Sequence, residues 1–457
     1  MKEILNKDGL LVGTVPDHWT VCKTLFVLSM PITDGPHTTP MLYSEGIPFI
    51  SAEAVSTGNG RINFNHIRGY ISKDFYNECC KKYIPEIDDI YMIKSGATTG
   101  KVAIVDTDKV FTIWSPLAVF RVNRNIVLPR FFYYFIQSET YKKQVELGWN
   151  YGTQQNIGMR MLEKLYVAFP ALEEQGVIIT YIDNQCSKID EAISRHRSII
   201  EKLEEYRKAV IAHAVTNGLD VNVETKDSEV EWIEKLPSMW KIVRLKSEFI
   251  FKKGLSITKA DLTDKGENVI SYGQIHSKNC DGVHVNNELV RYVPSDITVK
   301  NQNSRVAPFG FIFADTSEDL SGCGNAIYVG NRDDIYGGYH TIVLNPKICR
   351  DNRYLAYLFR TDIWRSQLRS QLTEVKLFSV SQKSLKEVDI ILPPDSEMQK
   401  IADYLDDKCS LIDEAISRQK AAIEKLEEYK KSIIYNAVTG KIDCRNISED
   451  HTTAERN

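Results

Sequence analysis

The chain has 457 residues, 43% of them hydrophobic, which is enough for about three domains, each with a buried core. Its net charge of −4 excludes a uniformly basic nucleic-acid-binding protein, but residues 1–170 (+2) and 241–394 (+4) are mildly basic, which permits contacts with nucleic-acid phosphates on two separate segments. The nine cysteines form no CxxC pair, no run approaches 18 apolar residues and the N-terminus has no apolar signal segment, so we expect a cytoplasmic protein that does not span a membrane.

The first segment, residues 1–170, contains short apolar runs separated by turn residues. We predict strands over residues 47–50, 89–93, 101–105 and 118–122, a helix from Pro129 through Lys142, and a strand over 162–170 that Pro170 ends. These elements predict one globular domain of mixed helices and strands.

Residues 171–220 predict a long helix. The apolar residues recur with the 3-4 spacing of a heptad repeat, which is typical of a coiled-coil seam. The seam consists of Ile182, Ile189, Ile193, Ile200, Leu203 and Val210. Because no proline or glycine occurs between Val177 and Asn217, the helix could approach 40 residues, or about 60 Å.

Residues 221–394 comprise a linker, which is polar and acidic as far as Lys235, and a second globular segment. Both segments open with a proline followed three residues later by a tryptophan, as Pro16 with Trp19 and Pro237 with Trp240. The second segment also has a predicted helix at residues 351–359, with Arg353 opposite Arg130, and a closing strand over 385–393. The two segments therefore share a predicted architecture, although their sequences have diverged.

Residues 395–443 predict a second long helix that repeats the first. Between residues 181–216 and 404–439, 23 of 36 positions are identical, and the second seam consists of Leu405, Ile412, Ile416, Ile423, Leu426 and Ile433. The identity extends to Asp190, Glu191 and Ser194, which we expect to face solvent. Such identity indicates a duplicated half whose two helices pair and present the same surface to a partner. The tail, residues 444–457, is polar and expected to be disordered.

No catalytic constellation is evident. Gly96, Gly100 and Lys101 resemble a phosphate-binding loop, but the spacing is one residue short and Val102 stands where a metal-binding Ser or Thr is required. The histidines lack metal-ligand spacing and no GxSxG motif occurs. We therefore predict no enzymatic activity and no metal site.

Polar loops in both globular segments are candidates for DNA contact, because amide side chains pair with adenine, arginine pairs with guanine, and lysine contacts phosphates. In the first segment these are a glycine-rich basic turn and an amide-rich loop, with the candidates Lys94, Thr98, Thr99, Lys101, Thr153, Gln154, Gln155, Asn156 and Arg160. In the second segment they are Lys252, Lys253, Gln302, Asn303, Arg305, Lys376, Ser379, Gln382 and Lys383.

Together, the paired Pro-x-x-Trp starts, the Gly96–Lys101 turn, the amide-rich loop and the repeated helices resemble the specificity (S) subunit of type I restriction–modification enzymes. The resemblance implies an α+β fold with an internal pseudo-two-fold repeat, in which two target recognition domains are separated by two long antiparallel coiled-coil helices. It implies that each domain reads one half of a bipartite, asymmetric site in double-stranded DNA, while the helices fix the spacer. It also implies two methyltransferase subunits and restriction subunits as partners. These partners would bring S-adenosylmethionine, ATP and Mg²⁺, so that this chain binds no cofactor.

Two alternatives remain open from the residues alone. A stand-alone DNA-binding regulator would bind DNA without an enzyme partner. A coiled-coil assembly scaffold would bind protein through its globular domains and would show no salt-dependent affinity for DNA.

Overall fold

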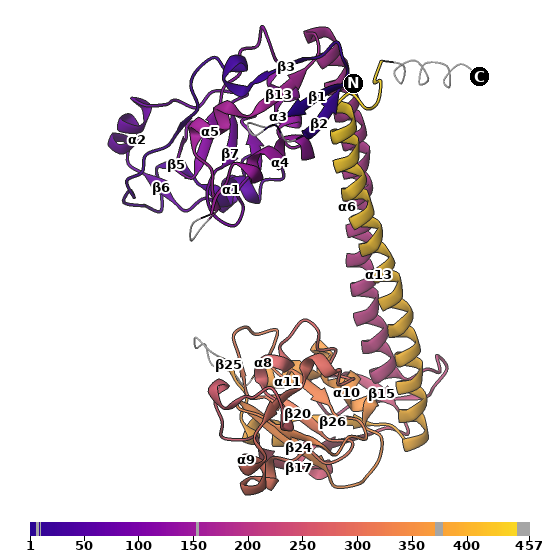
Figure 1. Ribbon diagram of the computed structural model, residues 1–457. Coiled ribbons are helices and arrows are strands. Elements are labelled where there is room, and N and C mark those ends of the chain that lie inside the picture. Colours follow the sequence, from indigo (N-terminus) through magenta and orange to yellow (C-terminus); the bar gives the residue numbers. More distant parts are fainter. Residues whose placement is uncertain (6–8, 10, 152–154, 371–377, 446–457) are drawn as a thin grey trace, which may run out of the picture. The chain divides into compact units, whose positions relative to one another are not determined.

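The computed structural model describes residues 1–5, 9, 11–151, 155–370 and 378–445. The chain forms two compact units, which we call unit 1 (residues 1–196 and 421–457) and unit 2 (residues 197–420). Two long helices, α6 (Leu172–Asn217) and α13 (Asp395–Val438), each contribute one stretch to each unit. The mixed fold class and the two long helices predicted from the sequence are confirmed (Figure 1). Both helices exceed the expected 40 residues, with 46 residues in α6, which begins before Val177 and includes Gly176, and 44 in α13.

Unit 1 is built on an antiparallel sheet with the strand order β4 (Thr33–Asp34), β10 (Leu117–Phe120), β7 (Ile90–Ile93) and β8 (Val102–Ile104). A second sheet pairs β5 (Ile47–Ile50) with β6 (Tyr70–Ile71) and, in parallel, with β9 (Thr112–Ile113). Smaller pairs join β1 (Lys2–Leu5) to β2 (Leu11–Val15), β3 (Thr20–Lys23) to β13 (Tyr166–Phe169), and β11 (Asn150–Tyr151) to β12 (Gln155–Asn156). The shorter helices are α1 (Ala52–Ser56), α2 (Lys73–Cys80), α3 (Pro129–Phe135), α4 (Glu139–Leu147) and α5 (Met159–Lys164).

Unit 2 repeats this topology. Its antiparallel sheet has the order β17 (Phe249–Lys253), β24 (Thr341–Pro346), β20 (Phe311–Ala314) and β22 (Ala326–Tyr328). In the second sheet β18 (Glu267–Ile270) pairs with β19 (Arg291–Val293) and, in parallel, with β23 (Ile335–Gly337). The smaller pairs are β14 (Thr225–Asp227) with β15 (Lys235–Pro237), β16 (Lys241–Arg244) with β26 (Asp389–Leu392), and β21 (Thr316–Ser317) with β25 (Phe378–Ser379). The helices are α7 (Leu245–Glu248), α8 (Tyr272–Ile275), α9 (Ser295–Lys300), α10 (Arg353–Phe359), α11 (Asp362–Arg369) and α12 (Gln382–Glu387).

Within each unit the two long helices pack against each other. In unit 1 the buried Ile189 and Ile193 of α6 form one cluster with Ile433 of α13, and Ile423 and Leu426 pack against it. The remaining seam residues are buried (Ile182, Leu405, Ile412, Ile416) or half-buried (Ile200, Leu203, Val210). The heptad stripe therefore faces inward along both helices, because burial of these apolar side chains stabilises the pair.

Equivalent ion pairs join the helices in the two units. The Asp190 carboxylate accepts a hydrogen bond from Lys430 at 2.6 Å in unit 1, and Asp413 pairs with Arg207 in unit 2. The equivalent residues in these pairs are 223 positions apart, as in the sequence repeat. Partly exposed pairs of this kind contribute little to stability, about 0–1 kcal/mol each, so the apolar seam rather than these pairs holds the helices together.

A tryptophan anchors each globular domain to the long helices. The buried Trp19 donates from Nε1 to Glu174 at 3.2 Å in unit 1, and Trp240 donates to Glu397 at 3.0 Å in unit 2. Gly440 follows α13 with φ of +64°, and a Cβ at this glycine would overlap Pro16 and lie 3.1 Å from the Trp19 ring. The Pro-x-x-Trp pattern of the sequence therefore marks a docking contact in both halves.

Two secondary-structure predictions need correction. The helix predicted from Pro129 through Lys142 is two helices, α3 and α4, because Ser138 caps the second by accepting a hydrogen bond from the Tyr141 amide. The closing segments predicted as strands begin as helices, since Leu162 lies in α5 and Leu385 in α12, and only the residues that follow are extended.

Candidate nucleic-acid interface

In unit 1 the two predicted loops are joined to each other. The glycine-rich turn connects β7 to β8, and Gly96 and Gly100 adopt φ of +96° and +90°, which favours glycine. Ser95 forms a β-bridge with Asn156, and the Ile157 amide donates to the Lys94 carbonyl at 2.9 Å. The turn and the amide-rich loop therefore form one surface, although about 60 residues separate them in the sequence.

Lys94 lies inside this surface rather than on it. Its ammonium group is 3.1 Å from the fully buried Asp34 carboxylate, which also pairs with Lys82, and the Lys94 side chain is only 13% exposed. Burial alone would raise the pKa of Asp34, but hydrogen bonds and charge from Lys82 and Lys94 outweigh it, so the pKa lies below its ordinary value. Lys94 thus supports the base of the turn through an ion pair.

We expect Asp34→Asn to lower the stability of unit 1 by about 3 kcal/mol at neutral pH, because it leaves two lysines without their buried partner. The folded-state pKa of Asp34 is depressed, so its contribution is fully present above about pH 5 and is lost as pH falls through the ordinary carboxyl range of about 4 towards the lower folded value. Urea unfolding from pH 7 to pH 3 should show that the difference in free energy of unfolding between wild type and variant becomes smaller on acidification. A difference that does not change with pH would contradict the role assigned to this carboxylate.

The other candidates of unit 1 vary in exposure. Lys101 is exposed and lies 3.4 Å from the Ser56 carbonyl, while Thr98 and Thr99 are half-buried and Thr99 donates to the Gly96 carbonyl at 2.6 Å. Asn156 and Arg160 are exposed. Thr153, Gln154 and the side chain of Gln155 lie outside the described residues. Lys101, Asn156 and Arg160 are therefore the described candidates with side chains open to a ligand.

In unit 2 the equivalent strands are joined in the same way. The Val380 amide donates to the Asp315 carbonyl at 2.8 Å, and Ser379 donates to the same carbonyl at 3.2 Å. Lys253, Ser379 and Gln382 line one cleft of about 440 Å³. The structure thus brings together three candidates from two distant stretches of chain, whereas Lys376 lies outside the described residues.

The remaining candidates of unit 2 differ in the exposure and hydrogen bonding of their side chains. The exposed Lys383 is the second residue of α12, as Arg160 is of α5, which makes this cation a shared feature of both units. Gln302 and Arg305 lie at a short 3-10 helix, where Gln302 donates to the Thr298 carbonyl and Arg305 to the Asp333 carbonyl. Asn303 is exposed, and Lys252 is half-buried within β17.

Two equivalent positions carry opposite charges in the two units. Asp34 ends β4 and Lys94 follows β7 in unit 1; Lys253 ends β17 and Asp315 follows β20 in unit 2. The same backbone framework therefore presents opposite charges at these positions, as a buried ion pair in unit 1 and with Lys253 exposed in the cleft of unit 2. This difference is expected if the two domains bind different sequences.

The sequence analysis missed the aromatic wall of the unit 2 cleft. Tyr339 and the exposed His340 line it, with ring centroids 5.6 and 5.3 Å from that of Tyr272, and His340 Nδ1 lies 3.3 Å from the Asp315 carboxylate. His340 has φ of +53°, a strained conformation for a non-glycine residue. The two glycines before Tyr339 were the sequence signal for an unusual backbone at this point.

Within the described ranges, no group of three or more His, Cys, Asp or Glu residues is placed to hold a metal ion. No helix there is both long and apolar enough to span a bilayer.

Comparison with known proteins identifies the family. The model of the type I restriction modification DNA specificity domain matches residues 41–205 and 237–425, which is more than half of the chain and includes one match in each globular segment. The chain belongs to this family.

Full-length relatives agree with this assignment. The chain is 26% identical over 449 residues to a Methanocaldococcus jannaschii protein that carries the name type I restriction enzyme MjaX specificity subunit, covering 94% of this chain and 95% of that protein. It is 21% identical to the MjaVIII specificity subunit of the same organism, covering 85% and 87%. A solved chain from work on complex assembly of the type I R-M system has the same fold, with a TM-score of 0.67, 15% identity and coverage of 94% and 100%. The predicted resemblance to a specificity subunit is confirmed.

In this specificity subunit, the same three side chains fix each recognition domain to a long helix. Arg130 of α3 pairs with Asp183 of α6 at 2.9 Å, and Tyr134 donates to the same carboxylate. In unit 2, Asp406 of α13 accepts hydrogen bonds from Arg353 and, at 2.6 Å, from Tyr357. The sequence analysis paired the two arginines but not their carboxylate partners. We call these contacts the docking triads.

Proposed function

We propose that this specificity subunit reads a bipartite, asymmetric site in double-stranded DNA, with one half-site for each globular domain. The observation that carries the proposal is that the two units share the contacts that hold their fold together but differ in the chemistry of their candidate surfaces. The docking triads and the tryptophan anchors recur in both units, while the charges at two equivalent positions of the candidate surfaces are reversed. Two domains with one fold but different loop chemistry are suited to bind two different sequences.

We further propose that α6 and α13 set the length of the unread spacer and dock two methyltransferase subunits. An exposed ion pair, Glu191 with Arg195, recurs as Glu414 with Arg418. Since exposed positions gain little stability from such pairs, their repetition supports a partner that binds both helices alike. Restriction subunits would join the same complex in the cytoplasm. S-adenosylmethionine, ATP and Mg²⁺ would belong to these partners, and this chain would be non-catalytic.

Methylation mapping tests the proposal. We expect the chain, expressed with its methyltransferase subunit, to direct adenine methylation to a single motif of two half-sites with a constant gap. Replacing residues 1–170 with the corresponding domain of another specificity subunit should change one half-site only and preserve the gap and the other half-site. Single-molecule sequencing of genomic DNA measures both.

Other outcomes separate the alternatives. A lack of methylation together with salt-sensitive DNA binding by the chain alone would favour a stand-alone regulator. A folded chain with neither property would favour a protein-assembly scaffold.

A further inference from the structure

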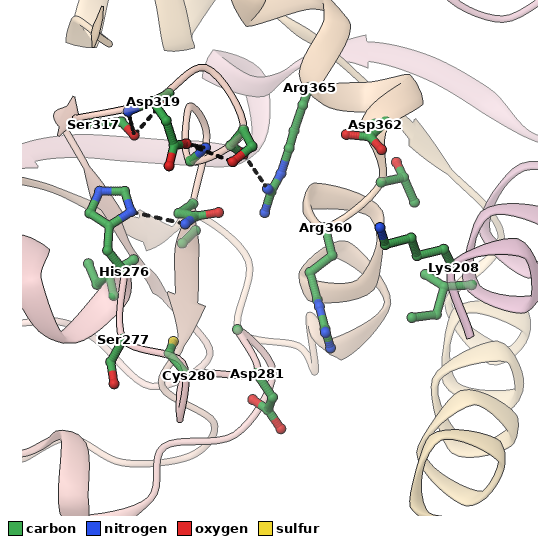
Figure 2. A pocket seen from close by; sticks show the side chains of 18 of the residues that line it. Lys208, His276, Ser277, Cys280, Asp281, Ser317, Asp319, Arg360, Asp362 and Arg365 are labelled. Atoms are coloured by element: carbon green, nitrogen blue, oxygen red, sulfur yellow. Dashed lines mark hydrogen bonds between the residues drawn. The ribbon is translucent and has the colours of Figure 1, made fainter. Parts of the chain in front are cut away.

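A cavity of about 1050 Å³ lies in unit 2, apart from the candidate cleft. Its walls come from the end of α6, from α8 and the loop that follows it, from the loop between β20 and β22, and from α11. Figure 2 shows Arg360 and Arg365 together with Lys208 of α6, and the loop that carries Asp281 on another side of the same space. None of these cations was among the predicted DNA-binding residues.

Backbone carbonyls hold Arg365 in place without a neutralising carboxylate. Arg365 donates from Nε to the Phe359 carbonyl at 2.7 Å and from Nη1 to the Ser321 carbonyl at 3.2 Å. In the part of unit 2 that the structure describes, no carboxylate forms an ion pair with Lys208, Arg360 or Arg365. Burial lowers the pKa of Arg365 to about 10, and repulsion from Arg369 and Arg360 adds to this effect. Lys208, Arg360 and Arg365 therefore carry positive charge that no ion pair within the described part of unit 2 neutralises, although five carboxylates also line the cavity.

Three of the acidic residues around the cavity are already engaged. Asp281 accepts hydrogen bonds from His284 and from the Val283 amide, and Asp319 accepts from Ser321 and the Gly322 amide. Asp362 pairs with Arg369 at 2.8 Å. Two further carboxylates, Glu204 and Glu318, also line the cavity, but neither forms an ion pair with the cluster. The free donors of Arg360 and Lys208 thus remain open to an added anion.

The repeat provides an internal comparison. Positions 360, 365 and 369 correspond to Gln137, Lys142 and Glu146 in unit 1. Lys142 keeps a cation at the position of Arg365, and Lys431 keeps one at the position of Lys208, so these two positions are basic in both units. The positive charges of Arg360 and Arg369 occur in unit 2 only, and a role in the fold that both units share would be expected to keep them in unit 1. Their restriction to unit 2 points to a ligand that this domain alone holds at this place.

We propose that this cavity binds a phosphate group, and that the phosphate is a backbone phosphodiester of the DNA held by the same domain. The inference rests on the proposed DNA-binding function. Guanidinium groups match the geometry of phosphate oxygens, and arginine is favoured at such sites. The site is also continuous with the candidate surface: Ser317 lines the cavity and lies in β21, whose partner strand β25 carries Ser379. This continuity favours DNA over a separate small anion.

The test compares two charge-matched double variants of the full chain in complex with its methyltransferase subunits. Lys208→Gln/Arg360→Gln removes two cations of the cavity, and Lys241→Gln/Lys265→Gln removes two exposed lysines that line neither the cavity nor the candidate cleft. Binding to a duplex with the mapped site is measured between 50 and 200 mM salt. We expect the cavity variant to reduce the slope of log affinity against log salt by about 0.9, as for one lost phosphate contact, with its base preference unchanged. The control should keep the wild-type slope.

Equal slopes for the cavity variant and the control would overturn the inference, and the proposed function would stand if wild type still preferred its own site. A reduced slope for the cavity variant would support the inference even if wild type showed no base preference, in which case only the proposed function would fail. A second arm measures thermal unfolding with added pyrophosphate. Stabilisation of wild type but not of the cavity variant, with unchanged DNA slopes, would assign the cavity to a free phosphate compound and overturn the assignment to DNA.

Discussion

Duplicating one heptad in each long helix should lengthen the unread spacer of the methylated motif by about three base pairs. The duplicated segments are residues 192–198 of α6 and 415–421 of α13, which occupy equivalent positions of the repeat. Seven residues add about 10 Å of helix, and each base pair adds about 3.4 Å. A whole heptad keeps the apolar seam in phase, so the helix pair should remain intact. Both half-sites should be unchanged in a methylation map.

The matched control inserts a copy of residues 192–198 after Val221, which is 85% exposed and lies between α6 and β14. This insertion lengthens the chain without lengthening either helix, so the spacer should keep its original length. An active double-heptad variant that still methylates the original motif would refute the role of the helices as the determinant of spacing.

Trp240→Ala should destabilise unit 2 by about 4 kcal/mol and leave unit 1 nearly unaffected. The Trp240 side chain is fully buried, packs edge-on against Tyr354 with ring centroids 6.2 Å apart, and donates to Glu397. Truncation would open a cavity and leave that carboxylate without its donor. Hydrogen exchange followed by mass spectrometry should show protection falling by about a thousandfold in β20 and β24, with little change in β7 and β10.

Two variants separate the causes of this loss. Met239→Ala changes the neighbouring residue, which is 75% exposed, and should have almost no effect. Glu397→Gln keeps a hydrogen-bond acceptor for the indole and should cost much less than loss of the ring. Equal loss of protection in both units of Trp240→Ala would contradict the assignment of this tryptophan to a separate core of unit 2.

The long helices could be predicted because their signal is local and occurs twice. The heptad spacing from Ile182 to Val210 identifies the buried stripe without reference to any other part of the chain. The break at Ser138 was missed because the apolar run before it continues the helical pattern, and a capping hydroxyl competes with the helix only over one turn. Element boundaries within the globular domains depend on such short-range contacts.

The candidate interface could be predicted only in part, since its geometry depends on long-range contacts. Lys94 follows a strand and resembles an exposed basic residue, but its partner Asp34 comes 60 positions earlier. Conversely, the pairing of Asn156 with Ser95 unites two loops that were named separately. The arginines of the cavity gave no sequence signal, because Arg360 and Arg365 belong to an ordinary amphipathic stretch until α6 and the loop after β20 are placed beside them.

The core of unit 1 includes Ala437, Val438 and Cys444 together with Ile178 and Ile182, whereas unit 2 consists of one continuous stretch of chain. During synthesis on the ribosome, all of unit 2 emerges before the residues that complete unit 1. Unit 2 can therefore reach its native state while the nascent chain is still growing, and residues 1–196 must wait with an uncovered apolar helix face until residues 421–445 are released. In newly made protein, the domain that is synthesised first is thus the one most exposed to chaperones and proteases. This exposure ends when the last turns of α13 pack against the rest of unit 1.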